Sequence, residues 1–328
     1  MMFYGIDIGT TSVGAVAIDE AERLVVSATC PHAADVAGLG AGVDEQDPAK
    51  LLSAVRSALA EVGAAPGVSI GWTGQMHGVV GVDAELNAVT RFVTWRDARR
   101  YAGRVMSGWA REGRKIFKCL SAPGYAIARL AGRCAIDETF LHSWHVEGET
   151  FPPDWLPELR PGSMLGDNQA GVYAVQCLAP GAAVVNIGTS GQLSVVGEGA
   201  GGERRPYPGG VLRCRASHAG GQALAALRER LGLSWDELNR RADEPAIAAC
   251  VDSIVDDLVG DIDLSGCTGL VGIGNALRLN PALRLGVERR FGRPCTFLDV
   301  PEMAAYGAAL HVKRMDSKQS RNKGQTMV

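Results

Sequence analysis

Near its start the sequence contains Tyr4-Gly5-Ile6-Asp7-Ile8-Gly9-Thr10-Thr11-Ser12, an apolar run that ends in a turn of glycine and hydroxyl residues. A second stretch has the same character: Val184-Val185-Asn186-Ile187-Gly188-Thr189-Ser190-Gly191. A further apolar run follows each stretch, so each predicts a strand, a tight turn and a second strand. The shared Ile-Gly-Thr recurs at an offset of 179 residues. This internal repeat predicts two related domains, which we expect at residues 1–179 and 180–313.

The residues between these repeats predict helices that alternate with short strands. Residues 47–63 have a helix-capping Asp, a Pro at the first helical position and a terminal Gly. Ser234 and Glu237 predict a capping box, and residues 280–292 predict a helix that Asn280 caps. Residues 68–72 and 269–273 are apolar runs of strand length. The alternation indicates the α/β class.

Composition excludes several classes of protein. The 328 residues are 46% hydrophobic and carry a net charge of −3, and they include no apolar run long enough to cross a bilayer. We therefore expect neither nucleic acid nor membrane as a partner. The start of the chain lacks the basic region of a secretory signal, and the eight cysteines show no metal-ligand spacing, so we expect a cytoplasmic protein with reduced thiols. We expect residues 314–328 to form a disordered tail.

The two glycine-hydroxyl turns are candidate phosphate-binding sites. Glycine allows close approach of the backbone, and the backbone N–H groups and hydroxyls of residues 9–12 can donate to phosphate oxygens. Asp7 could hold a hydrated Mg²⁺ beside them. A plain polar turn is the alternative for one copy alone, but the second copy favours a ligand. The chain lacks a P-loop motif, and the glycines at 197, 199 and 202 precede Pro206, which excludes the helix of a dinucleotide-binding fold.

Six motifs in this order resemble those of the FGGY family of carbohydrate kinases. They cover nearly the whole chain, to about residue 312, and within the family the likeness is to sedoheptulokinases first and xylulokinases next. Together they are more specific than any one motif alone. The motifs are Gly5–Ser12, Gly74–Gly78, Thr94–Asp97, Gly166–Gln169, Asn186–Gly191 and Gly272–Asn275.

The resemblance implies two ribonuclease H-like domains of the actin and hexokinase type, with ATP and a sugar meeting in the cleft between them. It implies that Asp7 contacts Mg²⁺ and that Asp167 is the general base. The residues implied to bind ATP are Gly9, Thr10, Thr11, Ser12, Gly188, Thr189, Ser190, Gly272, Gly274 and Asn275. The residues implied to bind the sugar are Gln75, Met76, His77, Trp95, Asp97, Asp167 and Asn168.

The chemistry of these side chains agrees with that assignment, although each has an alternative. A carboxylate at Asp167 can accept the proton of an attacking hydroxyl, or it can cap a helix, or both. Gln75 and His77 carry groups suited to vicinal hydroxyls. Met76 is expected to pack, and Trp95 could lie against the sugar or fill the core. His142 and His145 lack a third metal ligand, so we expect them to be surface or packing residues.

The chain is shorter than the family members that it resembles. Only seven residues separate Leu159 from Asp167, where the resemblance implies a further segment. We expect a kinase that transfers the terminal phosphate of ATP to a ketose, with sedoheptulose as the first choice of substrate. A pentulose kinase is one alternative, and a weak or inactive relative that only binds nucleotide or sugar is another. The expected partner is a small sugar, and a homodimer is an open alternative to a monomer.

Overall fold

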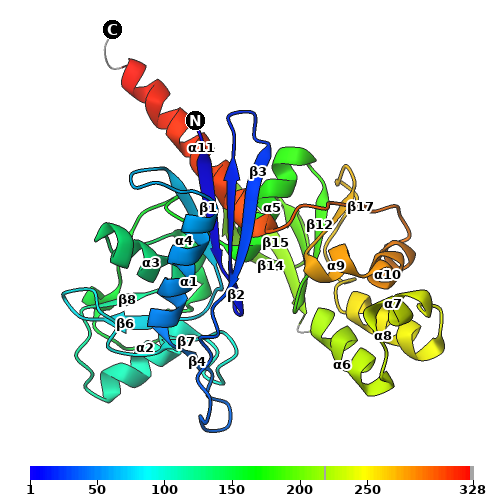
Figure 1. Cartoon of the computed structure of the whole chain (residues 1–328), viewed down its shortest axis with the longest axis horizontal. Coiled ribbons are helices and arrows are strands. Elements are labelled where there is room, and N and C mark those ends of the chain that lie inside the picture. The colour runs from blue at the N-terminus through cyan, green and yellow to red at the C-terminus, as the bar shows by residue number, and fades with distance from the viewer. Residues whose placement is uncertain (218, 326–328) are drawn as a thin grey trace. The chain divides into compact units, whose positions relative to one another are not determined.

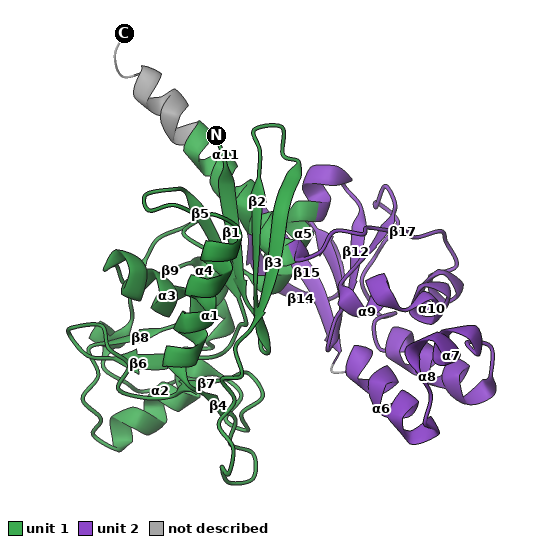
Figure 2. Ribbon diagram, viewed as in Figure 1, with its two compact units in different colours: residues 1–174, 304–328 green, residues 175–303 purple. Residues whose placement is uncertain are grey.

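The computed structural model describes residues 1–217 and 219–325, with side chains as far as Ser317. The chain divides into two compact units (Figures 1 and 2). Unit 1 comprises residues 1–174 and 304–328, and unit 2 comprises residues 175–303. Each has its own hydrophobic core. The first boundary lies five residues before the predicted one, whereas residues 304–313, which we expected in the second domain, belong to unit 1.

The sheet of unit 1 has five strands in the order β11-β5-β1-β2-β3. Strands β1, β2 and β3 pair antiparallel, and β5 and β11 continue the sheet parallel to β1. The parallel strands end at one edge of the sheet, which is where α/β folds place ligands. The bounds are β1 Phe3–Ile8, β2 Ser12–Ile18, β3 Leu24–Pro31, β5 Ile70–Gly74 and β11 Leu165–Gly166.

The sheet of unit 2 repeats this arrangement with one more antiparallel strand, in the order β14-β15-β13-β12-β16-β17. Strands β12, β13 and β15 correspond to β1, β2 and β3, and β16 and β17 are parallel to β12. The predicted internal repeat and the predicted α/β class are therefore confirmed. The bounds are β12 Ala183–Ile187, β13 Gly191–Val196, β14 Glu203–Tyr207, β15 Gly210–Ser217, β16 Leu270–Ile273 and β17 Thr296–Phe297.

Helices and short strands complete unit 1. Helix α1 starts as predicted, because the Asp47 side chain accepts the N–H of Ala49 and Pro48 takes the first position. The other helices are α2 Ala102–Arg111, α3 Ala122–Ala131, α4 Glu138–Ser143 and the 3-10 turn Pro153–Trp155, with α1 at Pro48–Glu61. The short strands are β4 Glu45–Gln46, β6 Val80–Val82, β7 Phe92–Val93, β8 Lys118–Leu120, β9 Ala135–Ile136 and β10 Glu158–Leu159.

The described residues of unit 2 include five helices. The predicted capping box of Ser234 and Glu237 is present at the start of α7. Asn280 precedes α10 as predicted, but its side chain makes no capping bond and donates instead to the carbonyl of Ala276. The bounds are α6 Gly221–Leu231, α7 Trp235–Arg240, α8 Pro245–Asp256, α9 Asn275–Leu279 and α10 Pro281–Phe291.

The last helix, α11 (Met303–Gln325), packs against the sheet of unit 1. A Cβ atom at Gly5 would lie 1.8 Å from the carbonyl oxygen of Ala305, and one at Gly71 would lie 1.9 Å from that of Ala308. Helix α5 (Asp167–Leu178) approaches α11 equally closely, because a Cβ at Gly307 of α11 would lie 1.8 Å from the carbonyl oxygen of Ala170 in α5. Only glycine permits such contacts between backbones.

Helix α11 also occupies most of the tail that the sequence predicted to be disordered. The helix runs through residues 314–325, and residues 326–328 of the predicted tail lie outside the described residues. Lys, Arg, Gln and Met favour helix, and extending an existing helix avoids the cost of starting one. Within the described part of the chain, no helix is both long and apolar enough to span a membrane.

Candidate functional site

The predicted catalytic and sugar-binding motifs of unit 1 meet at one edge of its sheet. Ile8 pairs with Gly74, and Gly74 pairs with Gly166, across three parallel strands. The next residue of each strand is Gly9, Gln75 and Asp167 respectively, so these three stand in one row. Neighbouring strands lie about 4.8 Å apart, which places Gly9 and Asp167 within roughly 10 Å of each other. We call this row and the turn Gly9–Ser12 the unit 1 edge.

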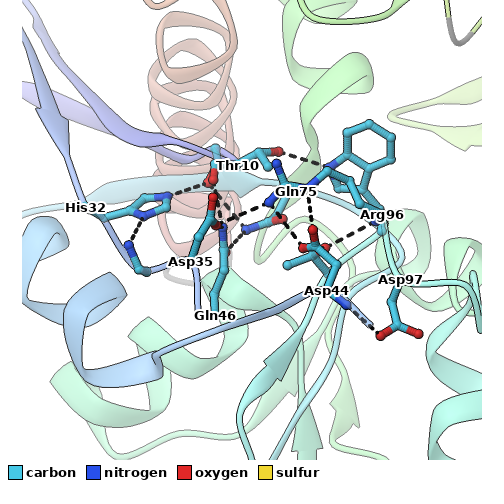
Figure 3. A network of polar contacts seen from close by, with 12 residues as sticks. Thr10, His32, Asp35, Asp44, Gln46, Gln75, Arg96 and Asp97 are labelled. Atoms are coloured by element: carbon cyan, nitrogen blue, oxygen red, sulfur yellow. Dashed lines mark hydrogen bonds and ion pairs between the residues drawn. The ribbon is translucent and has the colours of Figure 1, made fainter. Parts of the chain in front are cut away.

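Side chains of unit 1 hold the turn Gly9–Ser12 by contacting its backbone carbonyl oxygens. The N–H of Gly9 donates to the carbonyl of Ser12 at 3.0 Å. The Gly9 carbonyl lies 3.4 Å from both His32 Nε2 and Gln75 Nε2, and Gln46 Nε2 donates to the Thr10 carbonyl at 2.7 Å (Figure 3). In a trans peptide the N–H points opposite to the C=O. The N–H groups of Thr10 and Thr11 therefore point away from these interior side chains, as an anion-binding turn requires.

His32 supports the turn as a neutral ring. Its Nδ1 accepts the N–H of Ala34 at 3.1 Å, so the proton of the neutral imidazole lies on Nε2 and is donated to Gly9. Burial lowers the pKa of His32, against smaller opposing contributions from the Gly9 carbonyl and Asp35. The ring thus remains a directed donor at neutral pH.

Trp95 and Arg96 connect the turn to a neighbouring loop. The indole N–H of Trp95 donates to Thr10 Oγ1 at 3.0 Å, and that hydroxyl keeps its own hydrogen to donate. Arg96 forms ion pairs with Asp44 at 3.1 Å and with Asp35 at 3.2 Å (Figure 3). The sequence offered a sugar contact or core filling for Trp95. The structure shows a further role, because this hydrogen bond fixes the position of the turn.

Asp97 is engaged within the protein. Its side chain is 2% exposed, and its two carboxylate oxygens accept four hydrogen bonds. Three come from the backbone and guanidinium of Arg99 and one from the N–H of Asp44. Burial raises the pKa of Asp97, but the bonds from Arg99 and Asp44 outweigh it and hold the pKa below the usual range. A carboxylate offers about four acceptor positions. The geometry therefore makes Asp97 a brace for its loop, although the sequence suggested a sugar contact.

Gln75, Met76 and His77 follow β5 in one loop and differ in surroundings. The backbone N–H of Gln75 donates to the Ile8 carbonyl, and its side-chain Nε2 donates to Gln46 at 2.9 Å. Its Oε1 is buried and meets no donor among the described residues, which is typical of a site that a ligand completes. Met76 is buried as expected, with its sulfur against Gly166.

His77 is anchored to helix α4 of the same unit. Its Nδ1 lies 2.8 Å from the Ser143 carbonyl, so Nδ1 carries the proton and Nε2 is the acceptor nitrogen. The residue has a φ of 65°, a conformation uncommon outside glycine, and its ring lies 5.6 Å from that of Tyr101 and 6.1 Å from that of His145. His142 and His145 are exposed, as the sequence predicted.

Asp167 is the first residue of α5 and directly follows the two-residue strand β11. The residue is partly exposed, and its carboxylate accepts the N–H of Asn168 at 2.6 Å, within the first turn of the helix. Asn168 is buried. Although few residues separate Leu159 from Asp167, β11 still pairs with β5 and supports the aspartate from the sheet.

Asp7 lies near the end of β1, two residues before Gly9, and is partly exposed. Alternation along the strand places it on the same face as Gly5 and Gly9. Residues 1–217 and 219–325 hold no group of three or more His, Cys, Asp or Glu that could bind a metal by themselves. A single carboxylate beside a turn with hydroxyls fits Mg²⁺, which is usually held by one or two carboxylates together with substrate phosphates.

The second turn, in unit 2, is held in the same manner by different groups. The N–H of Gly188 donates to the Ser190 carbonyl at 3.0 Å. The Gly188 carbonyl accepts the N–H of Gly221 at 2.8 Å, and the Thr189 carbonyl accepts that of Gln222 at 3.4 Å. The N–H groups of Thr189 and Ser190 therefore point away from α6.

The two turns differ by one residue. Ile8 pairs with Val13, but Ile187 pairs with Gly191, so the first turn has residues 9–12 and the second has residues 188–190. Val13 and Gly191 therefore occupy equivalent positions in the two sheets, and so do the residues before them, Ser12 and Ser190.

The residues Gly272, Gly274 and Asn275, which the family resemblance implies to bind ATP, lie beside this second turn. Strand β16 is parallel to β12, with Asn186 opposite Ile273, so Gly274 and Asn275 follow at the edge that bears the turn. Gly274 has a φ of 97°, and a Cβ there would lie 2.5 Å from Asn186 Oδ1 and the Ile187 carbonyl. Asn275 is exposed. Gly272 is buried, and it packs closely against the ring of Phe297.

Sequence reasoning missed the residues that hold the turns. His32 and Gln46 lie in segments without a motif, and only the fold shows that their side chains bind the first turn. The pair Gly220-Gly221 does carry a signal, since two glycines at the start of an apolar helix indicate a close backbone approach. A Cβ at Gly220 would lie 2.5 Å from the Thr189 carbonyl, and one at Gly221 would lie 2.7 Å from the Gly188 carbonyl.

The chain is similar to known sugar kinases. Human sedoheptulokinase is 30% identical over 282 residues, and the match spans 58% of each chain, so this chain covers less than two thirds of that relative. A solved "xyloylose kinase" of Brucella ovis has a TM-score of 0.79 at 20% identity, over 95% of this chain and 90% of the other. A glycerol kinase of Plasmodium falciparum solved with ADP has a TM-score of 0.74 at 14% identity, over 97% and 92%.

These structures confirm the predicted fold, the two-domain α/β architecture of the sugar kinases. In addition, residues 2–120 match the family model described as the N-terminal domain of the FGGY family of carbohydrate kinases. That range contains the first turn and the Gln75–His77 loop. Residues 2–120 are therefore similar to the N-terminal domain of the FGGY family of carbohydrate kinases.

Proposed function

We propose that this protein is an ATP-dependent carbohydrate kinase that phosphorylates a ketose. The observation that carries the proposal is the row of Gly9, Gln75 and Asp167 at the unit 1 edge. Phosphoryl transfer requires a phosphate-binding group, a group that orients the acceptor hydroxyl and a base for its proton. The row brings one residue of each kind into a single line on a rigid sheet.

The turn at the unit 1 edge would bind the transferred phosphate. The N–H groups of Thr10 and Thr11 and the hydroxyl hydrogen of Thr10 are available on its outer side, and interior side chains fix the peptide planes. Donors that are already oriented stabilise charge that develops on the phosphoryl oxygens without reorganisation during the reaction. Asp7 would hold Mg²⁺, which neutralises phosphate charge when bound.

Asp167 would act as the general base. The acceptor hydroxyl of the sugar would donate to its carboxylate as the oxygen attacks phosphorus, so the proton passes to Asp167 while the bond to the leaving phosphate breaks. Its partial exposure leaves the carboxylate accessible. Gln75, His77 through Nε2 and Asn168 are proposed to bind sugar hydroxyls. Met76, Trp95 and Asp97 would shape the same site by packing and bracing.

Unit 2 carries a second set of residues that we propose to bind ATP. Its turn at Gly188–Ser190 repeats the outward N–H groups of the first turn, and Gly274 and Asn275 form the adjacent loop that we propose for the adenosine. We accordingly propose that residues of the N-terminal domain bind sugar and the terminal phosphate and that unit 2 binds the nucleotide.

Sedoheptulose is the substrate that the comparisons favour, through the 30% identity with human sedoheptulokinase. Xylulose is the second candidate, since its kinase is among the solved structures of the same fold. The chain covers only 58% of the curated relative, and this observation favours one further candidate function, a module that binds nucleotide or sugar without turnover. We also propose a cytoplasmic location, because the eight cysteines, all of them in the described residues, are thiols and form no disulfide.

The test is ADP release by the purified protein with Mg²⁺ and ATP. Sedoheptulose, xylulose, ribulose, fructose and glycerol would be compared with a reaction without sugar. Asp167→Asn removes the base, and Asp154→Asn, an exposed carboxylate of the same unit, is the matched control. Sugar-dependent ADP that is lost only in Asp167→Asn supports the kinase and names its substrate. ATP binding by calorimetry without ADP release with any of these sugars would establish the binding module instead.

A further inference from the structure

We propose that Thr139, held by Asp137, is the positioning residue for the catalytic aspartate Asp167. This inference rests on the proposed kinase function. Neither residue belongs to the six motifs, and neither was a candidate from the sequence. Their place in the structure is the start of helix α4, beside the loop that leads into Asp167.

The hydrogen bonds at the start of α4 reach this loop at both ends. Asp137 caps α4 by accepting the N–H of Thr139 at 2.9 Å, and its second oxygen accepts the N–H of Gly162 at 2.6 Å. Thr139 Oγ1 accepts the N–H of Gly166 at 2.9 Å. Gly166 is the residue directly before Asp167, so the last peptide N–H before the proposed base is held by Thr139.

This bond compensates for the position of β11 in the sheet. Strand β11 has only two residues and lies at the edge, so it pairs with β5 on one side alone. The outward N–H of an edge strand needs another acceptor when it is buried. Thr139, which is 1% exposed, supplies that acceptor in place of a further strand.

Gly166 has little freedom to move in other directions. A Cβ at this residue would lie 2.5 Å from Met76 Sδ and 2.6 Å from Gln169 Oε1. The peptide is therefore confined by β5 on one side, by these side chains on its own face and by Thr139 on the outer side. The Thr139 hydroxyl therefore fixes the remaining side of the Gly166 peptide. Because this peptide leads directly into α5, its direction determines where Asp167 lies.

Asp137 fixes the backbone of Thr139 and of the loop that precedes Gly166. Its side chain is 2% exposed, and its two carboxylate oxygens accept the backbone N–H groups of Thr139 and Gly162. Burial nevertheless raises the pKa of Asp137 above its usual value. Because the bond to Asp137 fixes the backbone of Thr139, the Thr139 hydroxyl oxygen is held where it accepts the Gly166 N–H.

The test is the substitution Thr139→Val, which keeps the size and removes the acceptor. We expect kcat to fall about tenfold to a hundredfold, because a displacement of about 1 Å at a reacting group has this order of effect. The KM values for sugar and ATP should stay within about twofold, since the binding groups are unchanged. Thr139→Ser restores the hydroxyl and should restore kcat. A purely structural role would alter stability without this split between kcat and KM.

The matched control is Thr90→Val. Thr90 Oγ1 accepts the N–H of Gly81 at 2.8 Å, which is the same kind of bond in the same unit away from the unit 1 edge. Its loss should leave kcat unchanged. If Thr139→Val does not fold, Thr139→Cys replaces the oxygen with a weaker acceptor of similar size, and an intermediate kcat is expected.

The outcomes separate this inference from the proposed function. Sugar-dependent turnover in the wild type with an unchanged kcat in folded Thr139→Val, or in Thr139→Cys, would overturn the positioning role and leave the kinase standing. A wild type without sugar-dependent turnover would refute the kinase itself. A fall of kcat that Thr139→Ser does not restore would also count against the hydroxyl.

Discussion

Replacing Gly220 by alanine tests whether the unit 2 turn binds ATP. Gly220 precedes α6 and is buried against the turn. Its φ of −170° is open to any residue, so the space around it decides the effect. A Cβ there would lie 2.5 Å from the Thr189 carbonyl oxygen and 2.6–2.7 Å from two Ser190 backbone atoms. All three are backbone atoms, which cannot rotate aside as a side chain could.

The size of the effect follows from these distances. An ordinary contact begins at 3.4 Å, so the turn must move by about 0.9 Å relative to Gly220. A displacement near 1 Å costs about a hundredfold in rate when it involves a group that positions substrate. Overpacking of this kind also costs about 1–3 kcal/mol of stability. With an unfolding entropy of about 2.1 cal/mol/K per residue, that is roughly 1.5–4.5 °C in Tm for 328 residues.

The assay is steady-state ADP release at varied ATP, well below both melting temperatures, with calorimetric titration of ADP. We expect Gly220→Ala to lower kcat/KM for ATP about a hundredfold. Gly269→Ala is the control, because Gly269 lies in the same unit with no heavy atom within 4 Å of a Cβ. Its kcat/KM should equal that of the wild type, and its Tm should not fall. A Gly220→Ala protein with a lowered Tm but wild-type kcat/KM for ATP would refute the assignment of this turn to ATP.

Three further predictions concern unit 1. Asp167→Asn should lower kcat by about 10²- to 10⁴-fold with ATP binding retained, because a general base contributes this much; an unchanged kcat in the ADP assay would exclude the role. Asp97 has a lowered pKa in the folded state, so its stabilising effect is complete above its usual value of 3.8 and is lost as the pH falls through its folded pKa. The Tm difference between wild type and Asp97→Asn should therefore be largest above about pH 5 and shrink below pH 3.8, and a constant difference from pH 3 to 7 would contradict the role of the Arg99 bonds. Gly108→Ala, inside α2 with open space at its Cβ, should raise the stability by about 0.5–1 kcal/mol, measured by urea unfolding.

The predictions that held depend on neighbours in the sequence. The start of α1 at Asp47 and Pro48 and the capping box at Ser234 and Glu237 are interactions over two or three residues, so the residues that make them are visible together. The two turns repeat because each occupies the same place in a copied arrangement of strands. Local chemistry of this kind can be inferred from the chain alone.

The interactions that the sequence did not reveal join residues far apart in the chain. Gln46 holds Thr10, and Thr139 holds Gly166, and in both cases the fold selects the partner. Asp97 shows a different reason. The motif drew attention to a carboxylate, but Arg99 two residues later occupies both of its oxygens, and this competition between partners depends on backbone geometry. The motifs could thus be recognised from sequence, while the contacts that their residues make required the structure, and the site itself stays a prediction.

The contact between α11 and the first strand has a consequence for the order in which the chain can fold during synthesis. Gly5 leaves the ribosome about 300 residues before its neighbour Ala305, which is roughly 15–60 s at 5–20 residues per second. Unit 2 is one continuous segment and can fold while α11 is still being made. The sheet face around Gly5 and Gly71 stays exposed, and needs protection from aggregation, until α11 has been synthesised and covers it.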